Sequence, residues 1–264
     1  MRFKSILIAF ALILLAASQG MSQYSAREDF AYTSGSGLDS LGAAIQGFGG
    51  WWFADTSNHN AATATGVVAD TGFDYSDLYS TSIAYAGNEL VAMSPGNWAS
   101  ARFKRALDKV WPDAAGQYWA SFLFETKGVP SGNTYYLFKL FSGNNERVAI
   151  GKGGGGTVYT CGSGWPGGSG PDVSTTQDAG GPVWLVTEIF LTGTQKDTNA
   201  ATYMWINPDP TSTTLDTNNA DVKRYTTDMT TGIDTVAVEW GGADTMEIAY
   251  DEIRLGTSFH DMVT

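Results

Sequence analysis

Strict alternation of apolar and polar residues marks residues 246–257, near the end of the chain, as a β-strand. With a period of two, Ala249, Asp251, Ile253 and Leu255 are expected on one face of that strand. Ile253 and Leu255 should face a hydrophobic core. An ionised carboxylate beside that core is costly unless it meets a cation, a metal ion or several backbone N–H groups. Asp251 therefore requires a partner.

Similar runs recur along the rest of the chain and predict further strands. They cover residues 100–107, 118–126, 135–142, 147–151, 183–191, 201–207 and 235–240. Turns rich in Gly, Pro, Asn and Asp separate them, and only residues 104–111 suggest a helix. Many strands with short turns predict an all-β fold, a two-sheet antiparallel jelly-roll sandwich.

Two segments look irregular. Residues 151–181 are so rich in glycine that we expect a long loop with one short strand near Val158. Residues 208–231 are rich in Thr, Asp and Asn and predict a solvent-exposed loop. The chain has no repeat of fixed period and no linker, so these segments belong to a single domain.

The first 22 residues predict a secretory signal peptide, because Arg2 and Lys4 precede an apolar run that ends in small residues. The mature chain, residues 23–264, is then a secreted, extracellular domain without a further membrane-spanning segment. It keeps 13 basic residues against 27 acidic ones, a net charge of −14. This balance argues against nucleic acid or an anionic membrane as a partner. Cys161 is the lone cysteine, so no internal disulfide forms.

Five motifs, in this order, resemble a concanavalin A-like lectin/glucanase superfamily domain of the laminin-G-like jelly-roll type, as found in secreted bacterial proteins. They are EDFAY at 28–32, YWASFLF at 118–124, VAIG at 148–151, WINPD at 205–209 and YDEIRLG at 250–256. The resemblance implies the jelly-roll fold. It does not fix an activity, because the superfamily includes lectins, carbohydrate-binding modules, glycosidases, lyases and structural domains.

A glycosidase of this superfamily commonly carries the strand motif Glu-x-Asp-x-x-Glu. Here Glu247 and Glu252 have the right spacing, but Ala249 stands where the middle aspartate belongs. On a regular strand the two glutamates would also point to opposite faces, unless a bulge intervened. Glu188 and Glu239 are lone carboxylates that a solvated strand face explains more simply. We therefore expect no catalytic residues and a protein that is not an enzyme.

Other charged groups give weaker signals. His59 and His260 lack a second histidine at metal-ligand spacing. One basic cluster could meet an anionic polysaccharide, although a charged outer strand face is the simpler explanation. That cluster comprises Arg102, Lys104, Arg105 and Lys109.

The nine tryptophans suggest a carbohydrate ligand, since a sugar ring stacks on an indole while polar groups bind its hydroxyls. Four of them lie inside predicted strands and are expected in the core, namely Trp119, Trp184, Trp205 and Trp240. The candidates for sugar binding lie in stretches flanked by Gly or Pro, and they are Trp51, Trp52, Trp98 and Trp165. We expect the adjacent pair Trp51 and Trp52 to split, with one side chain inward and one outward.

The resemblance also implies a structural Ca²⁺ between an acidic residue near the mature N-terminus and an aspartate in the last strand. Glu28, Asp29 and Asp251 would be its ligands, with backbone carbonyls and water completing the shell. This site requires the first and last strands to lie side by side. Arg27, Arg254 or backbone N–H groups are alternative partners for Asp251.

The sequence thus predicts a secreted, non-catalytic carbohydrate-binding or adhesive module of the extracellular matrix, with a polysaccharide or glycan as its partner. One alternative is a structural subunit that self-associates through its sheet edges, with the segment before Phe30 as the donor strand. Another is a glycoside hydrolase or lyase with an atypical site.

Overall fold

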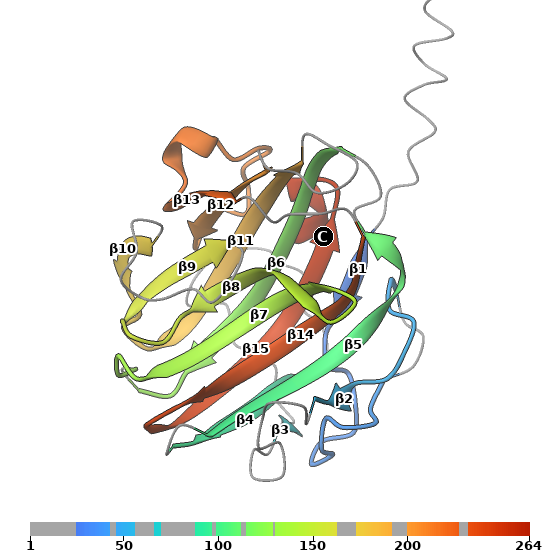
Figure 1. Ribbon diagram of the computed structural model, residues 1–264, viewed down its shortest axis with the longest axis vertical. Helices are drawn as coiled ribbons and strands as arrows, with labels where there is room; N and C mark the ends of the chain where they lie inside the picture. Colours follow the sequence, from blue (N-terminus) through green and yellow to red (C-terminus); the bar gives the residue numbers. More distant parts are fainter. Residues whose placement is uncertain are drawn as a thin grey trace, which may run out of the picture.

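The computed structural model shows two antiparallel β-sheets packed face to face (Figure 1). It describes residues 25–42, 46–55, 66–69, 88–96, 99–111, 115–128, 130–162, 173–191, 200–226 and 232–264. The predicted signal peptide lies outside these residues. Within them, no helix has the length and apolar character needed to cross a membrane. The predicted antiparallel sandwich is confirmed.

The eight-stranded sheet has the order β13-β12-β11-β6-β15-β4-β3, with β1 pairing to β15. Its strands are β1 (Ala26–Glu28), β3 (Gly66–Ala69), β4 (Glu89–Pro95), β6 (Gly116–Thr126), β11 (Gly181–Leu191), β12 (Ala200–Ile206), β13 (Val222–Thr226) and β15 (Thr245–Gly256). The expectation that the first and last strands lie side by side is confirmed, since Glu28 pairs with Ile253.

The seven-stranded sheet has the order β10-β9-β8-β7-β14-β5-β2. Its strands are β2 (Phe53–Ala54), β5 (Ala99–Trp111), β7 (Thr134–Ser142), β8 (Asn145–Lys152), β9 (Val158–Gly162), β10 (Val173–Gln177) and β14 (Ile233–Gly242). Two short 3₁₀ helices, η2 (Thr217–Asn219) and η3 (Phe259–Met262), complete the fold.

The alternating runs identified the long strands correctly, but the predicted helix at 104–111 was wrong. These residues continue β5, which pairs with β14 along most of its length, for example Lys104 with Ala237. The pairing satisfies the backbone groups that a helix would have satisfied internally. Residues 208–231, expected to be loop, contain η2 and β13, and the glycine-rich segment contains β10 besides the expected strand near Val158.

Aromatic side chains from both sheets fill the space between them. Phe124 of β6 lies 4.9 Å from Tyr136 of β7, ring centre to ring centre, and Phe103 stacks on Trp240 at 5.6 Å. Such ring pairs contribute about 1 kcal/mol each beyond the burial of their area. Large buried rings thus hold the two layers together without a disulfide.

A second apolar cluster covers part of the outer face of the eight-stranded sheet. Trp119 stacks on Trp205 at 5.7 Å, and Phe259 of η3 packs against Trp119 and Trp184. The four tryptophans expected in the core are indeed buried, but three of them lie in this outer cluster. The C-terminal 3₁₀ helix therefore shields that region of the sheet from water.

A bulge in β15 changes the face assignment made from the alternation. The pairing of β15 with β6 shifts register between Asp251 and Arg254, and Glu252 adopts a left-handed φ of 48°. An extra residue in a strand reverses which later residues face inward. Ile253 and Leu255 belong to the inter-sheet core, whereas Asp251 continues the outer face that Ala249 shares. The expectation that Asp251 and Ile253 share a face was wrong.

Candidate functional site

The pair Trp51 and Trp52 splits as expected. Trp51 is 63% exposed, whereas Trp52 is fully buried and donates a hydrogen bond from Nε1 to Glu28 at 2.9 Å. Trp52 therefore cannot stack on a ligand, and its place among the sugar-binding candidates is corrected. Trp98 and Trp165 lie outside the described residues.

Phe53 adds a second exposed ring beside Trp51. Exposure alternates along residues 51–53, with Trp52 buried between two exposed rings, and Phe53 is 47% exposed. Phe53 pairs with Lys104 of β5 at the edge of the seven-stranded sheet. Cross-strand partners share a face. The two rings therefore adjoin the outer face of that sheet.

Ion pairs cover the part of this outer face next to the rings. We call it the polar face, and its members are Asp55, Arg102, Lys104, Lys139, Glu146 and Glu239. Glu239 lies at its centre, 2.5 Å from Arg102 Nε and 2.9 Å from Lys139 Nζ. Each strand contributes alternate residues to the face, because the intervening residues, such as Val238, fill the core.

The outer members extend the chain of ion pairs toward the exposed rings. Asp55 Oδ2 lies 2.8 Å from Lys104 Nζ and 3.3 Å from Arg102 Nη1. At the other end, Glu146 accepts from Lys139 Nζ at 2.8 Å. The cations of Lys104 and Arg102 also lie over the ring of Phe141, at 4.7 and 5.3 Å from its centre. Such contacts fix the cations in place.

The electrostatics favour the charged forms of Glu239 and Arg102. Burial alone would raise the pKa of Glu239, but the charges of Lys139 and Arg102 outweigh burial and hold the pKa below its ordinary value. Burial tends to lower the pKa of Arg102, yet Glu239 and Asp55 raise it overall. Burial raises the pKa of the neighbouring Tyr135 phenol to about 12. Three cations and three carboxylates balance, so the polar face has no net charge.

This arrangement is suited to binding and not to acid catalysis. A glycosidase needs one carboxylic acid whose raised pKa keeps it protonated. Glu239 is instead ionised by its two cationic partners. The expectation of a solvated strand face was wrong for Glu239 and Glu188, since both side chains are buried.

The two glutamates of the partial glycosidase motif have different environments. Glu252 is buried and accepts hydrogen bonds from Arg27 and Arg254 at 2.8–3.1 Å. Glu247 is half-buried and lies five residues before Glu252 on β15, opposite Met93. Two guanidinium groups thus occupy both carboxylate oxygens of Glu252.

The three predicted calcium ligands do not converge. Glu28 points into the core with its partner Ile253, whereas Asp251 lies on the outer face. Asp29 accepts from the backbone N–H of Ala31 at 3.3 Å. Within the described ranges, no three His, Cys, Asp or Glu side chains form a metal-binding group. Calcium stays a prediction, and these three residues do not fit as its ligand set.

Glu28 instead pairs with Arg105, deep between the sheets. Its carboxylate accepts from Arg105 Nη1, from Tyr32 Oη at 2.7 Å and from the backbone N–H of Phe30 at 2.8 Å. Both members of the pair are fully buried, so Arg105 does not belong to a surface basic cluster. Asp251 accepts from the backbone N–H of Glu252 at 2.7 Å, one of the alternatives that the sequence left open.

The N-terminal segment thus pairs with a strand of its own chain. β1 occupies a place beside β15, and Arg27 forms the ion pair with Glu252 at 2.8 Å. A donor strand for another subunit would have to leave this place. The described contacts therefore do not favour the strand-exchange alternative.

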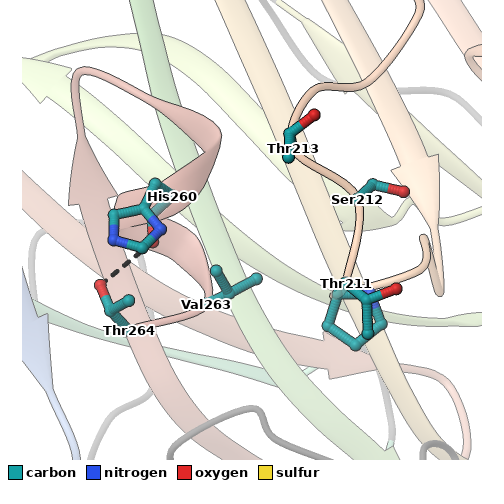
Figure 2. A pocket seen from close by; sticks show the side chains of 7 residues that line it. Thr211, Ser212, Thr213, His260, Val263 and Thr264 are labelled. Atoms are coloured by element: carbon teal, nitrogen blue, oxygen red, sulfur yellow. Dashed lines mark hydrogen bonds between the residues drawn. The ribbon is translucent and has the colours of Figure 1, made fainter.

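A separate hollow of about 440 Å³ lies between residues 210–213 and the C-terminal residues of the chain (Figure 2). Residues 210–213 face His260, Val263 and Thr264 across it, and Thr264 Oγ1 donates to the His260 carbonyl at 3.1 Å. Its lining contains hydroxyl groups and one imidazole, but neither a carboxylate nor a large exposed aromatic ring. We therefore place the candidate site on the polar face.

Sequence reasoning named Trp51, Arg102 and Lys104, and considered Glu239 as a lone carboxylate, but missed the other members of this site. Phe53 lies in a two-residue strand that is too short to alternate, Asp55 follows that strand, and Lys139 and Glu146 lie within or next to apolar runs. A signal was present in β7 and β14, because Lys139 and Glu239 are charged residues within strands of otherwise large apolar residues. Only the pairing of strands distant in sequence shows that they meet.

Comparisons with known proteins do not assign a family. No family model and no curated protein matches the chain. Solved structures that resemble it include the cellulose induced protein Cip1, at 13% identity and a TM-score of 0.47, covering 79% of this chain and 94% of that one. Another is domain 4 of AbnA, an extracellular arabinanase from Geobacillus stearothermophilus, in complex with arabinotriose. It is 13% identical, covers 90% of this chain and 100% of that one, and has a TM-score of 0.43.

A third similar structure comes from work on endo-acting O-glycanases of human gut microbiota that initiate mucin breakdown. It is 9% identical, covers 88% of this chain and 98% of that one, and has a TM-score of 0.47. These similarities are too weak to carry a functional argument. The function must come from the chain's own residues.

Proposed function

We propose that this protein is a non-catalytic carbohydrate-binding module that holds a neutral polysaccharide on the outer face of its seven-stranded sheet. The observation that carries this proposal is the exposed pair Trp51 and Phe53 beside the polar face. Aromatic rings bind the apolar C–H face of a sugar, and nearby charged groups bind its hydroxyls. With the predicted signal peptide, binding takes place outside the cell.

The polar face supports a neutral ligand over an anionic one. Arg102, Lys104 and Lys139 each already have a carboxylate partner within 3.3 Å. An anionic sugar would have to compete with Asp55 and Glu239 for those cations. A neutral hydroxyl can instead share the partly accessible Arg102, Lys104 and Asp55, because a cationic side chain has several donor hydrogens and a carboxylate oxygen has free lone pairs.

The rigidity of this face also supports binding. Lys139 and Glu239 are buried, and each holds two partners or more, so the network loses little side-chain freedom when a ligand arrives. A preorganised surface converts more of its contact energy into affinity. Trp51 and Phe53 then provide the apolar contact.

The test is native affinity electrophoresis of the mature chain in gels that contain one polysaccharide each. Soluble β-glucan, xylan, arabinan and galactomannan are the neutral probes, and polygalacturonate is the anionic one. We expect retardation by at least one neutral polysaccharide. Replacing both rings, Trp51→Ala with Phe53→Ala, should weaken binding by about 2 kcal/mol or more, roughly thirtyfold.

Val110→Ala is the matched control, because Val110 is also an exposed apolar residue on β5 but lies away from the polar face. It should leave retardation unchanged. Retardation by none of the neutral probes would refute the proposal, as would binding to polygalacturonate alone. Running each gel with and without a chelator tests the calcium prediction separately.

A further inference from the structure

A second pair of exposed rings lies on the other sheet. Phe190 of β11 is 39% exposed and Tyr225 of β13 is 74% exposed. Ile189 and Leu191, the neighbours of Phe190, belong to the inter-sheet core, so Phe190 points to the outer face of the eight-stranded sheet. Tyr225 shares that face, since both rings pair with Ala201 of the intervening strand.

The strand register places one short side chain between these rings. Phe190, Ala201 and Tyr225 are aligned across three adjacent strands, so the backbone positions of Phe190 and Tyr225 lie about 10 Å apart, at two strand spacings. Ala201 has a short side chain and is buried, so it forms the floor. A span of this size accommodates sugar units of an extended polysaccharide, with one ring at each end.

The adjacent row supplies groups that bind hydroxyls. Glu188, Tyr203 and Lys223 are aligned across the same three strands. Glu188 is buried at the base of this row, whereas Tyr203 is half-buried and Lys223 is exposed, so these last two supply the accessible groups. Gln117, the exposed β6 partner of Phe190, adds an amide at the other side. Rings and polar groups thus alternate as they do around Trp51 and Phe53.

We infer that the outer surface formed by Phe190, Tyr203 and Tyr225 is a second polysaccharide site, and that the protein therefore bridges two polysaccharide chains. This inference rests on the proposed function. The two surfaces lie on opposite layers and at opposite edges of the sandwich, with β2 at the lower right and β13 at the upper left of Figure 1. A single extended chain cannot lie across both.

The chemistry of this surface favours a glycan over a protein partner. A protein interface has a contiguous apolar centre from which charged residues are depleted. Here the two exposed rings are separated by Ala201, and Lys223 lies beside Tyr225 on the same short strand. Isolated rings among hydrogen-bonding groups instead match the alternating apolar and hydroxyl surfaces of a neutral sugar.

Two sites on one rigid body have a measurable consequence. When one surface binds a polysaccharide chain, the second surface is held close to neighbouring polysaccharide chains. Its effective concentration there rises, which strengthens retention without new contacts. The protein then cross-links polysaccharide, whereas a one-site module only coats it. Cross-linking is therefore the property that distinguishes the second site from the first.

The experiment uses the neutral polysaccharide with the strongest retardation and an oligosaccharide prepared from it. Isothermal titration with the oligosaccharide should give two sites per wild-type chain. Either double variant, Trp51→Ala with Phe53→Ala or Phe190→Ala with Tyr225→Ala, should give one. Beads coated with the polysaccharide should aggregate with wild-type protein and with Val110→Ala, and aggregation should fall at least tenfold with either double variant.

The outcomes separate the two proposals. One site in the wild type, lost with Trp51→Ala and Phe53→Ala and unaffected by Phe190→Ala and Tyr225→Ala, overturns the second site and leaves the proposed function intact. Unchanged bead aggregation in the Phe190 and Tyr225 variant also overturns it. If no neutral polysaccharide binds the wild type, both proposals fail. All the substituted side chains are exposed, and equal melting temperatures establish that each variant is folded.

Discussion

At the scale of single residues, burial decides which side chains act and in which protonation state. Trp51 and Trp52 are adjacent and chemically identical, yet one is exposed and the other is a core residue bonded to Glu28. Asp178 shows the same effect on a carboxyl group. It is 2% exposed, and burial raises its pKa to about 6, although the backbone N–H of Gly180 lowers it in part.

Asp178 makes stability depend on pH. The pKa of Asp178 is higher in the folded protein than in the unfolded chain, because folding disfavours the charged form. The stability that the protonated form contributes is therefore intact below about pH 4 and is lost as the pH rises through about 6. Asp178→Asn should therefore stabilise the protein by up to about 3 kcal/mol at pH 7.5 and change little at pH 4. Urea unfolding at both pH values measures this difference.

The exposed Asp108 provides the control for that measurement. Asp108→Asn should have a small effect that is the same at both pH values. A stabilisation by Asp178→Asn that is equal at pH 4 and pH 7.5 would contradict the assignment to ionisation.

At the scale of elements, the bulge in β15 decides what the last strand does. The sequence alternation is regular before Asp251 and after Glu252, but the extra residue between them reverses the two faces. Ile253 and Leu255 thereby reach the core, while Glu252 and Arg254 stay together with Arg27 of β1. The bulge thus explains how a strand with acidic residues can lie beside the core.

Glu252→Ala should be strongly destabilising. It leaves the guanidinium groups of Arg27 and Arg254 without their common carboxylate, at a cost of about 3 to 5 kcal/mol. Glu247→Ala, on the same strand but half-buried, is the control and should cost less than about 1 kcal/mol. Urea denaturation measures both, and equal losses of stability would contradict this role of Glu252.

At the scale of the whole molecule, the N-terminal segment joins the two layers. Glu28 belongs to β1 in the eight-stranded sheet and Arg105 to β5 in the seven-stranded sheet, so their ion pair spans the sandwich. Removing one member of such a pair leaves a buried charge uncompensated. This ion pair thus links the layers in addition to the aromatic core.

A double-mutant cycle tests this link. Glu28→Gln and Arg105→Met should each lower the free energy of unfolding by about 3 kcal/mol or more, whereas the double variant should lose clearly less than the sum. The coupling should exceed about 1 kcal/mol by urea denaturation. Additive losses would mean that the two residues act independently.

The sequence alone determined the two-layered all-β fold, the long strands and the split of Trp51 and Trp52, because side-chain alternation along an extended chain is a local property. Only the tertiary structure decided which strands are neighbours, where β15 bulges and which charges meet. Lys139 and Glu239 are 100 residues apart, so no local pattern relates them. Glu28 likewise looked like half of a metal site until the packing of two sheets placed Arg105 against it. Long-range pairing sets the environment of each buried charge, and that environment fixes what the charge can do.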